Sequence, residues 1–431
     1  MDLVADLQAR GLVQDATDLD ALAKRLAEGP IGAYVGFDPT ADSLHVGHLV
    51  GQLTLRRLQL AGHRPFPLAG GATGMVGDPS GRSEERNLLD RETLRHNVAR
   101  ITAQLERILD FSPGPFQAEL VDNADWTAEI PVLDFLRDVG KHVTVNQMLA
   151  KESVRSRMES EQGLSFTEFS YMLLQANDFR WLLEHRGVEL QMGGSDQWGN
   201  ITAGIDLIRR TLGASVHGLT WPLVARSDGA KMGKTASGAV WLDPERTSPY
   251  QFRQFWVQVP DTDVQRFLLQ FTFRSVDDVD ALVAEHQVAP ERRVAQRALA
   301  HDVTAVVHGE EAARAADEAA AVLFGGDPTT ASAAALEVVR REVPGTTVPA
   351  GTLDDLVAIL VRTGLASSNS DARRTLTQGG FRANGRVLGE QDTLTDVRPL
   401  ADRFLLLRRG KSSYHLLEIS PATVDGRHPG R

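Results

Sequence analysis

Strand-like and helix-like patterns alternate along the first part of the chain. The run "GAYVGFD" is rich in β-prone residues and ends at Asp38-Pro39. It is followed by "SLHVGHLVGQLTLRRLQLAG", whose apolar residues keep helical spacing until Gly62. "RPFPLAGGATGMVGDPSG" predicts a second strand before a glycine-rich loop, and "VELQMGGSDQWGNITAGIDLIRR" repeats the order of strand, loop and helix. This alternation predicts a parallel α/β sheet with ligands at the carboxyl ends of its strands.

Helical patterns dominate the middle of the chain. Residues 90–185 are predicted to be mainly helical, and "VLDFLRDVGKHVTVNQMLA" within them is apolar enough for an internal helix or a subunit interface. Residues 246–324 predict amphipathic helices. The stretch 311–351 is alanine-rich and then broken by three prolines, which predicts a helix followed by a linker. We therefore expect a domain boundary near residues 345–352.

The last segment has a different pattern. Two short helical patterns precede "FRANGRVL", whose Asn384-Gly385 pair between β-prone flanks predicts a hairpin. Four arginines could share one surface of this segment: Arg373, Arg374, Arg382 and Arg386. An ordinary solvated helix and hairpin is the alternative.

Charge is distributed unevenly along an otherwise average composition. The 431 residues contain 42% hydrophobic and 24% charged residues, which is typical of a folded globular protein. The net charge is -11, yet residues 351–431 hold 12 Lys+Arg against 9 Asp+Glu. A basic tail on an acidic body suggests that the tail binds a polyanion.

Several classes of protein are disfavoured by what the sequence lacks. There is no cysteine, which excludes disulfides, thiolate zinc sites and a cysteine nucleophile. No apolar run approaches the length of about 18 residues that spans a membrane, and the acidic start is unlike a signal peptide. We expect a cytoplasmic protein.

His45 and His48 lie three positions apart and should share one helix face, with Asp42 or Ser43 as the helix cap. A zinc site would need more ligands, and helical zinc histidines are typically four apart, so we expect no metal here. One core and one exposed histidine is a further alternative. Gly47 between them costs about 1 kcal/mol in a helix, which favours the close approach of a flat ligand. Two imidazoles at a helix start suit the phosphates of a nucleotide.

"RSDGAKMGKTASG" places Lys231 and Lys234 in a glycine-rich loop with few apolar residues. Such a loop could close over a triphosphate and stabilise the charge that develops as pyrophosphate leaves. A plain surface loop is the alternative. The spacing differs from that of a Walker loop.

Polar residues form a stripe in "FTEFSYMLLQANDFRWLL". Tyr171, Gln175 and Asp178 fall on one helix face among apolar neighbours, so this face should look into a polar pocket rather than water. Tyr34 and Asp178 could hold a ligand hydroxyl, while Tyr171, Gln175 and Asp78 could hold an ammonium group. "GGSDQWGN" supplies Gly193 and Gly194 for close approach and Asp196 as an acceptor for sugar hydroxyls, although a plain turn would have the same glycines.

With these motifs the chain closely resembles the bacterial-type tyrosyl-tRNA synthetases over nearly its full length. "HVGH" at 45–48 matches the HIGH signature and "KMGKT" at 231–235 matches KMSKS. The resemblance implies a class I enzyme that makes tyrosyl-adenylate from tyrosine and ATP and transfers tyrosine to tRNA. It implies a Rossmann-like catalytic domain over 1–245, with a dimer interface around 120–185, then a helical domain over 246–345 and an α+β RNA-binding domain over 350–431.

The resemblance also implies residue roles. Tyr34 and Asp178 would contact the phenol, and Asp78, Tyr171 and Gln175 would contact the ammonium group. The amino-acid and ATP sites would be lined by Gly36, Asp38, Gly47, Gly194, Asp196 and Gln197. Thr40, His45, His48, Lys231, Lys234 and Thr235 would act on the phosphates. ATP would bring Mg²⁺ as its companion, with no tightly bound cofactor or protein metal site. The partners would be tRNA and a second copy of the chain.

Two alternatives stay open. A tryptophanyl-tRNA synthetase shares the fold and signatures, but an indole has no hydroxyl for Tyr34 and Asp178. An RNA-binding protein that kept the fold without catalysis would not need the four signature histidines and lysines.

Overall fold

The structure is a computed structural model of the chain. It describes residues 2–80, 89–159, 163–225, 227, 229, 232–235 and 238–420. Two compact units are present: unit 1 is Met1–Ser248 with Phe255–Val307, and unit 2 is Pro249–Gln254 with His308–Arg431. The predicted boundary near residues 345–352 therefore lies inside unit 2.

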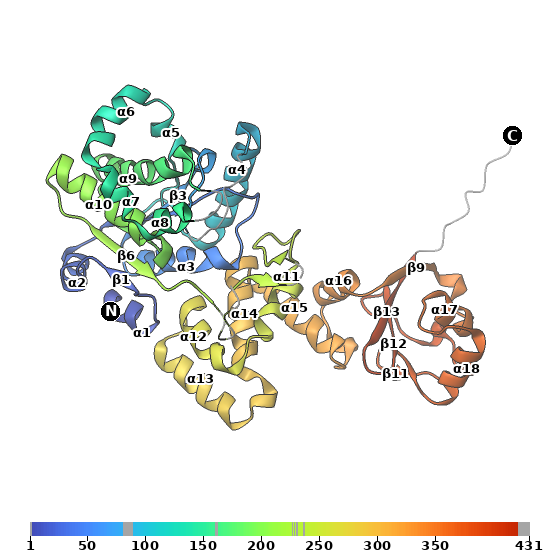
Figure 1. Cartoon of the computed structure of the whole chain (residues 1–431). Helices are drawn as coiled ribbons and strands as arrows, with labels where there is room; N and C mark the ends of the chain where they lie inside the picture. Colours follow the sequence, from blue (N-terminus) through green and yellow to red (C-terminus); the bar gives the residue numbers. More distant parts are fainter. Residues whose placement is uncertain are drawn as a thin grey trace. The chain divides into compact units, whose positions relative to one another are not determined.

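Unit 1 is built on a six-stranded sheet in the order β1-β6-β5-β2-β3-β4 (Figure 1). All neighbours pair in parallel except the short β1. The strands are β1 Asp15–Ala16, β2 Gly32–Phe37, β3 Arg64–Ala69, β4 Val121–Asp122, β5 Val188–Gly194 and β6 His217–Trp221. The strand-loop-helix orders predicted from "GAYVGFD" and "VELQMGG" are confirmed, as is the parallel α/β class.

Helices cover both faces of this sheet because its central strand is apolar on both faces. Tyr34 on β2 packs with Phe179 and Ile208 of α9 (Phe166–Arg186) and α10 (Trp198–Leu212). The other face is covered by α3 (Val46–Leu60), which packs on β2 and β3. Such continuous burial is typical of a parallel strand.

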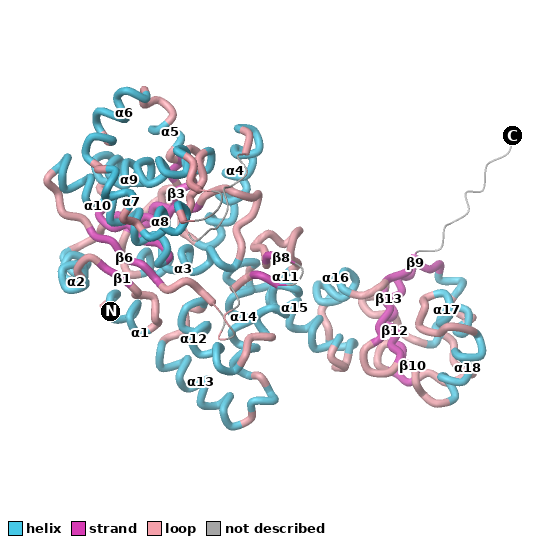
Figure 2. Tube along the Cα trace, in the orientation of Figure 1, coloured by secondary structure: helices cyan, strands magenta, loops and turns pink. Residues whose placement is uncertain are grey.

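The remaining described elements of unit 1 are mostly helical, as predicted for residues 90–185 (Figure 2). They are α1 Leu3–Ala9, α2 Leu19–Glu28, α4 Arg91–Ile108, α5 Ala124–Thr127, α6 Val132–Asp138, α7 Val145–Leu149, α8 Glu152–Met158, α12 Asp261–Phe271, α13 Val276–Val288 and α14 Val294–His308, with α11 Pro249–Val257 shared between the units and the small hairpin β7 Lys234–Thr235 and β8 Gly238–Ala239.

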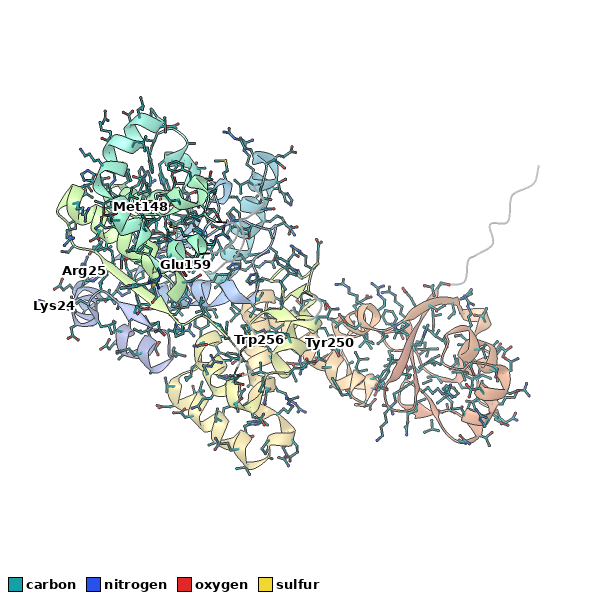
Figure 3. The ribbon with its side chains drawn as sticks, in the orientation of Figure 1. Lys24, Arg25, Met148, Glu159, Tyr250 and Trp256 are labelled. Atoms are coloured by element: carbon teal, nitrogen blue, oxygen red, sulfur yellow. The ribbon has the colours of Figure 1, made fainter. Side chains whose placement is uncertain are left out.

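Aromatic packing and one ion pair illustrate how these helices are held. Trp256, labelled in Figure 3, is fully buried with its ring centroid 4.8 Å from that of Phe271. Arg25 of α2, also labelled there, donates to both carboxylate oxygens of Glu189 on β5 at 2.7 and 2.8 Å. None of the described helices is both long enough and apolar enough to cross a membrane.

Unit 2 is a sheet in the order β11-β10-β12-β13-β9 with helices on both faces. Its elements are α15 Glu310–Leu323, α16 Ala333–Glu342, β9 Gly345–Pro349, α17 Leu356–Arg362, α18 Asn369–Thr377, β10 Phe381–Ala383, β11 Arg386–Val387, β12 Phe404–Arg409 and β13 Ser413–Ser420. Alternation along β12 explains the layers, since successive strand residues point to opposite faces. Leu405 and Leu407 pack with α17 and α18, whereas Phe404 and Leu406 pack with α15 and α16.

The hairpin predicted at Asn384-Gly385 is confirmed. Both residues have positive φ, 47° and 85°, and join β10 to β11. The linker predicted before residue 351 is wrong at residues 345–349, because these residues form β9 and pair in parallel with β13. Its partner lies about 70 residues further along, so a local pattern of prolines gave no sign of it.

Candidate active site

A tyrosine of β2 and a carboxylate of α9 are both buried at the centre of the candidate site. Tyr34 is 1% exposed, and its hydroxyl has no hydrogen-bond partner among the described residues. Asp178 on α9 is also 1% exposed. Burial raises the pKa of Tyr34 well above its ordinary value, and the negative charge of Asp178 adds to this rise. An unpaired buried hydroxyl costs about 1 to 3 kcal/mol, so this one suits a ligand that brings a polar group.

Two donors that sequence reasoning missed hold Asp178. The indole N–H of Trp126 donates to Oδ1 at 2.8 Å, and the Asn123 amide donates to Oδ2 at 2.9 Å. Burial nevertheless raises the pKa of Asp178 to about 7, although both hydrogen bonds lower it. The sequence signal was "DNADW" directly after β4, where the carboxyl end of a parallel strand should carry site residues.

A chain of hydrogen bonds joins Asp178 to Tyr171, another residue of the polar stripe of α9. Asn123 also donates to the Thr73 hydroxyl at 3.1 Å, and Thr73 donates to Asp38 at 3.0 Å. The Tyr171 hydroxyl donates to the same Asp38 carboxylate at 3.1 Å. The structure thus brings Tyr34, Asp38, Tyr171 and Asp178 together, and the alternative of a polar stripe in water is wrong.

A second group lies around Gln197. Its amide donates to Asp78 at 2.7 Å, while its carbonyl oxygen accepts from Asn200 at 3.1 Å and from Gln175 at 3.4 Å. The carbonyl oxygen of Gln175 is buried and has no hydrogen-bond partner in the part of the chain that the structure describes. Acceptors without donors suit a cation such as an ammonium group. Asp78, Gln175 and Gln197 are therefore together, as predicted.

Neighbouring atoms leave no room for a side chain at the two glycines of "GGSDQW". A Cβ on Gly194 would lie 2.7 Å from the Asp196 carboxylate, and one on Gly193 would lie 2.9 Å from Gln197 Cβ. Gly36 is exposed at the end of β2, where a Cβ would meet only Leu68 at 3.9 Å. Thr40 is exposed just beyond, and its amide donates to the Asp38 carbonyl at 2.8 Å.

His45 is the cap of α3, which corrects the expectation that Asp42 or Ser43 would cap it. Its Nδ1 accepts from the Gly47 amide at 3.0 Å, while the His45 amide donates to Nδ1 of His48 at 3.3 Å. The two rings stack with centroids 4.0 Å apart. A Cβ on Gly47 would lie 2.8 Å from His45 Cε1, so Gly47 is needed for the ring of His45 itself.

Ser43 and Asp42 serve other contacts. The Ser43 hydroxyl accepts from the Gln104 amide at 3.0 Å and from the Asp243 amide at 3.2 Å, and Asp42 pairs with Arg246. Among the residues that the structure describes, no group of three or more acidic or histidine side chains could hold a metal ion.

The "KMGKT" segment lies against the start of α3 where it is described. Val46 donates to the Val240 carbonyl at 3.0 Å, and the backbone of His45 pairs with that of Trp241. Gly233 has φ of +80°, and a Cβ there would lie 3.3 Å from Val46 Cβ. Lys231 lies outside the described residues, as do the side chains of Lys234 and Thr235. The two signature segments are therefore neighbours in the backbone.

In unit 2 the predicted arginines lie on α18, β10 and β11. Arg373 and Arg374 are exposed on α18, and Arg374 pairs with Asp371 at 3.1 Å. Arg382 donates to the Gly385 carbonyl at 2.9 Å, and Arg386 pairs with Asp392 at 2.7 Å. These partners are local to each arginine.

Comparison with known proteins identifies the family of the chain. Residues 26–325 match the family described as tRNA synthetases class I (W and Y), and residues 335–417 match the Tyrosine--tRNA ligase SYY-like C-terminal domain. The tyrosine–tRNA ligase of Opitutus terrae is 53% identical over 424 residues, which cover 97% of this chain and all of that protein. The chain belongs to the tyrosyl-tRNA synthetases.

Further relatives support this membership in sequence and in structure. The tyrosine–tRNA ligase of Roseiflexus castenholzii is 51% identical over 425 residues, or 97% of this chain and 99% of that protein. A C-terminally truncated mitochondrial tyrosyl-tRNA synthetase of Aspergillus nidulans superposes with a TM-score of 0.68 at 34% identity, covering 75% of this chain and 94% of that one. The predicted family, fold class and reaction are confirmed: the tyrosyl-tRNA synthetase uses ATP to activate tyrosine and passes it to tRNA.

Proposed function

We propose that this tyrosyl-tRNA synthetase selects its amino acid with Tyr34 and Asp178. The observation that carries this is the buried Tyr34 hydroxyl, which lies near the buried Asp178 carboxylate and has no hydrogen-bond partner within the described residues. A substrate phenol would donate to Asp178 and accept from Tyr34. Phenylalanine would leave both groups unpaired, an asymmetry for which tyrosyl-tRNA synthetases are the established example.

The ammonium group of tyrosine binds among Asp78, Tyr171 and Gln175 in this proposal. The partnerless Gln175 oxygen and the Asp78 carboxylate both attract a cation. Gln197 bridges these groups and orients them. Gly36, Asp38, Gly47, Gly194 and Asp196 line the ATP site, where Asp196 accepts from ribose hydroxyls.

Activation of tyrosine by ATP needs electrostatic stabilisation of the transition state and no protein nucleophile. The tyrosine carboxylate attacks the α-phosphorus of ATP, and pyrophosphate leaves from the opposite side. Thr40, His45 and His48 stabilise the pentacoordinate phosphorus, and Lys231, Lys234 and Thr235 stabilise the departing pyrophosphate. In the second step a 3′-terminal hydroxyl of tRNA attacks the carbonyl of the adenylate, and AMP leaves.

ATP carries Mg²⁺ into this site. The ion would be held mainly by the phosphates and water. When bound, Mg²⁺ supplies charge neutralisation on the phosphates. A cytoplasmic location stays a prediction.

The arginines of unit 2 bind tRNA in this proposal. Arg373 and Arg374 are exposed on α18, and Arg382 and Arg386 lie on the neighbouring hairpin, where their charges can contact phosphates. Charging of tRNA by variants of these arginines tests the assignment, because pyrophosphate exchange needs no RNA.

A second copy of the chain binds the apolar surface of residues 132–145. Val132, Leu133 and Leu136 on α6 are 70%, 75% and 50% exposed, and Val145 on α7 is 59% exposed. Apolar exposure on this scale is typical of a protein interface. Light scattering should give twice the chain mass for the wild type and half of that for Leu133→Asp, and an unchanged mass for the variant would contradict the interface.

The test of amino-acid selection is ATP-pyrophosphate exchange with tyrosine, tryptophan and phenylalanine. Asp178→Ala should lose about 2 to 4 kcal/mol of transition-state binding for tyrosine, or roughly 30- to 1000-fold in kcat/KM, and little for phenylalanine. Exposed Asp277→Ala is the control. Unchanged discrimination would remove Asp178 from its role, exchange with tryptophan would favour the sister enzyme, and no exchange would favour a non-catalytic RNA-binding protein.

A further inference from the structure

A ladder of stacked rings runs outward from the back of the Asp178 carboxylate. The rings of Trp126 and Trp181 are nearly parallel, at 10°, with centroids 4.2 Å apart. Trp181 stacks in turn on His185, with centroids 4.4 Å apart and an angle of 13°. Asp178, Trp181 and His185 stand at positions i, i+3 and i+7 of α9, so one face of the helix carries both the carboxylate and the ladder.

The outer ladder is itself tied to α9. Nδ1 of His185 donates to the Trp181 carbonyl at 2.9 Å, which fixes the imidazole over the indole. The Arg186 guanidinium lies 5.3 Å from the Trp181 ring, a cation–π distance, and donates to Glu119 at 2.6 Å. His185 is exposed and Trp181 is half-buried, so the ladder connects the buried site to the surface.

The stack with Trp181 is one of the contacts that hold Trp126. Trp126 belongs to α5, a helix of only four residues, whose cap residue Asn123 makes no side-chain capping bond because its amide and carbonyl groups bind elsewhere. A single turn of helix is unstable alone, so tertiary contacts must hold the indole. Trp126 is 7% exposed and packs in a core cluster with Val121 and Phe179, and Trp181 adds a flat ring contact to the indole whose N–H bonds Asp178.

We propose that Trp181 is a positioning residue for tyrosine selection, which holds the Trp126 indole in the orientation that donates to Asp178. The inference rests on the proposed role of Asp178. Without Trp181 the indole of Trp126 can turn, and Asp178 then loses a donor that stabilises its charged form. A neutral carboxyl accepts the substrate phenol less well, so the loss appears in tyrosine recognition rather than in the chemistry at the phosphate.

The charge state of Asp178 provides the discriminating readout. Its neighbours are Tyr34 on β2, Asp38 after β2 and Asp122 on β4. The charges of Asp38 and Asp122 raise the pKa of Asp178, and the Trp126 bond lowers it. Loss of that bond should move the pH at which tyrosine binding weakens to a higher value. A residue that only contributes packing would not move it.

The experiment measures pyrophosphate exchange against pH in the full-length enzyme carrying Trp181→Ala or Trp181→Phe. Trp181→Ala should raise KM for tyrosine about threefold to tenfold, with kcat and phenylalanine parameters unchanged and the pH midpoint of KM shifted upward. Trp181→Phe keeps a flat ring and should recover most of the loss. Glu184→Ala on the same helix is the matched control.

Near-ultraviolet circular dichroism monitors the stack independently, since either variant removes the signal of the two stacked indoles. An altered spectrum with an unchanged tyrosine KM and pH midpoint in Trp181→Ala would overturn the proposal. Trp181→Leu, which keeps apolar bulk but has no flat ring, decides this if Trp181→Ala does not fold. Trp181→Ala in a Trp126→Phe background should have no further effect, and additive losses would also overturn it. Asp178→Ala distinguishes failure of the proposed role of Asp178 from failure of the proposed role of Trp181. If Asp178→Ala leaves the discrimination between tyrosine and phenylalanine unchanged, the role of Asp178 itself is wrong.

Discussion

Asp178 is a carboxylic acid whose surroundings hold it near its point of titration. It is 1% exposed, and among the described residues it accepts from two neutral donors, Asn123 and Trp126, and pairs with no cation. The pKa of about 7 follows from burial, with the charges of Asp38 and Asp122 adding to it. The charged carboxylate of Asp178 is a strong acceptor for a phenol, but its burial lowers the free energy of unfolding of the enzyme without substrate.

This balance predicts a pH-dependent stability. Folding raises the pKa of Asp178 from an ordinary 3.8 to about 7. The contribution of Asp178 to the free energy of unfolding is therefore fully present below pH 3.8, and it is lost as the pH rises through 7. Between pH 5 and 8 the wild type should lose roughly 3 kcal/mol of unfolding free energy relative to Asp178→Asn. Urea unfolding followed by tryptophan fluorescence measures this in unit 1, where all six tryptophans lie. Parallel pH profiles for the two proteins would contradict it.

Elements of the fold divide into those with a local pattern and those without one. The order of β2, α3, β5 and α10 followed from spacing, because each buries a continuous or periodic set of side chains. The cap at His45 did not, because an imidazole is an uncommon cap and its contact depends on Gly47. Trp126 lies in a four-residue helix that is too short to show any period, and Asn123 is the cap of that helix. The long-range pairing of β9 likewise gave no local sequence pattern.

Helix α12 anchors the chain just before the "KMGKT" segment. Asp263, 2% exposed, accepts from the Ser227 amide at 2.9 Å and hydroxyl at 3.0 Å, and Arg266 donates to the Ala225 carbonyl at 2.7 Å. At its other end, α12 is tied to α3 by Arg57, which donates to the Leu269 carbonyl at 3.2 Å. The helix thus contacts the chain just before the "KMGKT" segment and also the carboxyl-terminal part of α3.

Asp263→Ala should therefore impair activation without affecting tyrosine recognition. Loss of a charged anchor, about 1.5 to 3 kcal/mol, should lower kcat of pyrophosphate exchange on the order of tenfold or more, while KM for tyrosine stays the same. Exchange kinetics at varied tyrosine and ATP measure both parameters. Asp277→Ala, at an exposed position of α13, should match the wild type. A raised KM for tyrosine with unchanged kcat would contradict this prediction, because it would show that Asp263 affects tyrosine binding and not the activation step.

At the scale of the whole molecule, the two units carry separate parts of the reaction. Unit 1 contains the residues proposed for tyrosine and ATP, and unit 2 contains the four arginines proposed for RNA. The core of unit 2 lies on both faces of its sheet, with Leu336 and Val339 of α16 packed against Phe404. A truncation at residue 344 would expose this face, so point substitutions on the surface are the better test.

Arg373→Glu with Arg382→Glu should separate charging from activation in the intact chain. Arg373 is exposed on α18 and Arg382 is bonded only through its own hairpin carbonyl among the described contacts, so the fold of unit 2 should survive. Loss of two phosphate contacts should raise KM for tRNA at least tenfold and lower the salt dependence of binding by about two in slope. Pyrophosphate exchange should not change, because it takes place in unit 1 without RNA. If charging stayed at the wild-type level, tRNA would have to bind through another surface.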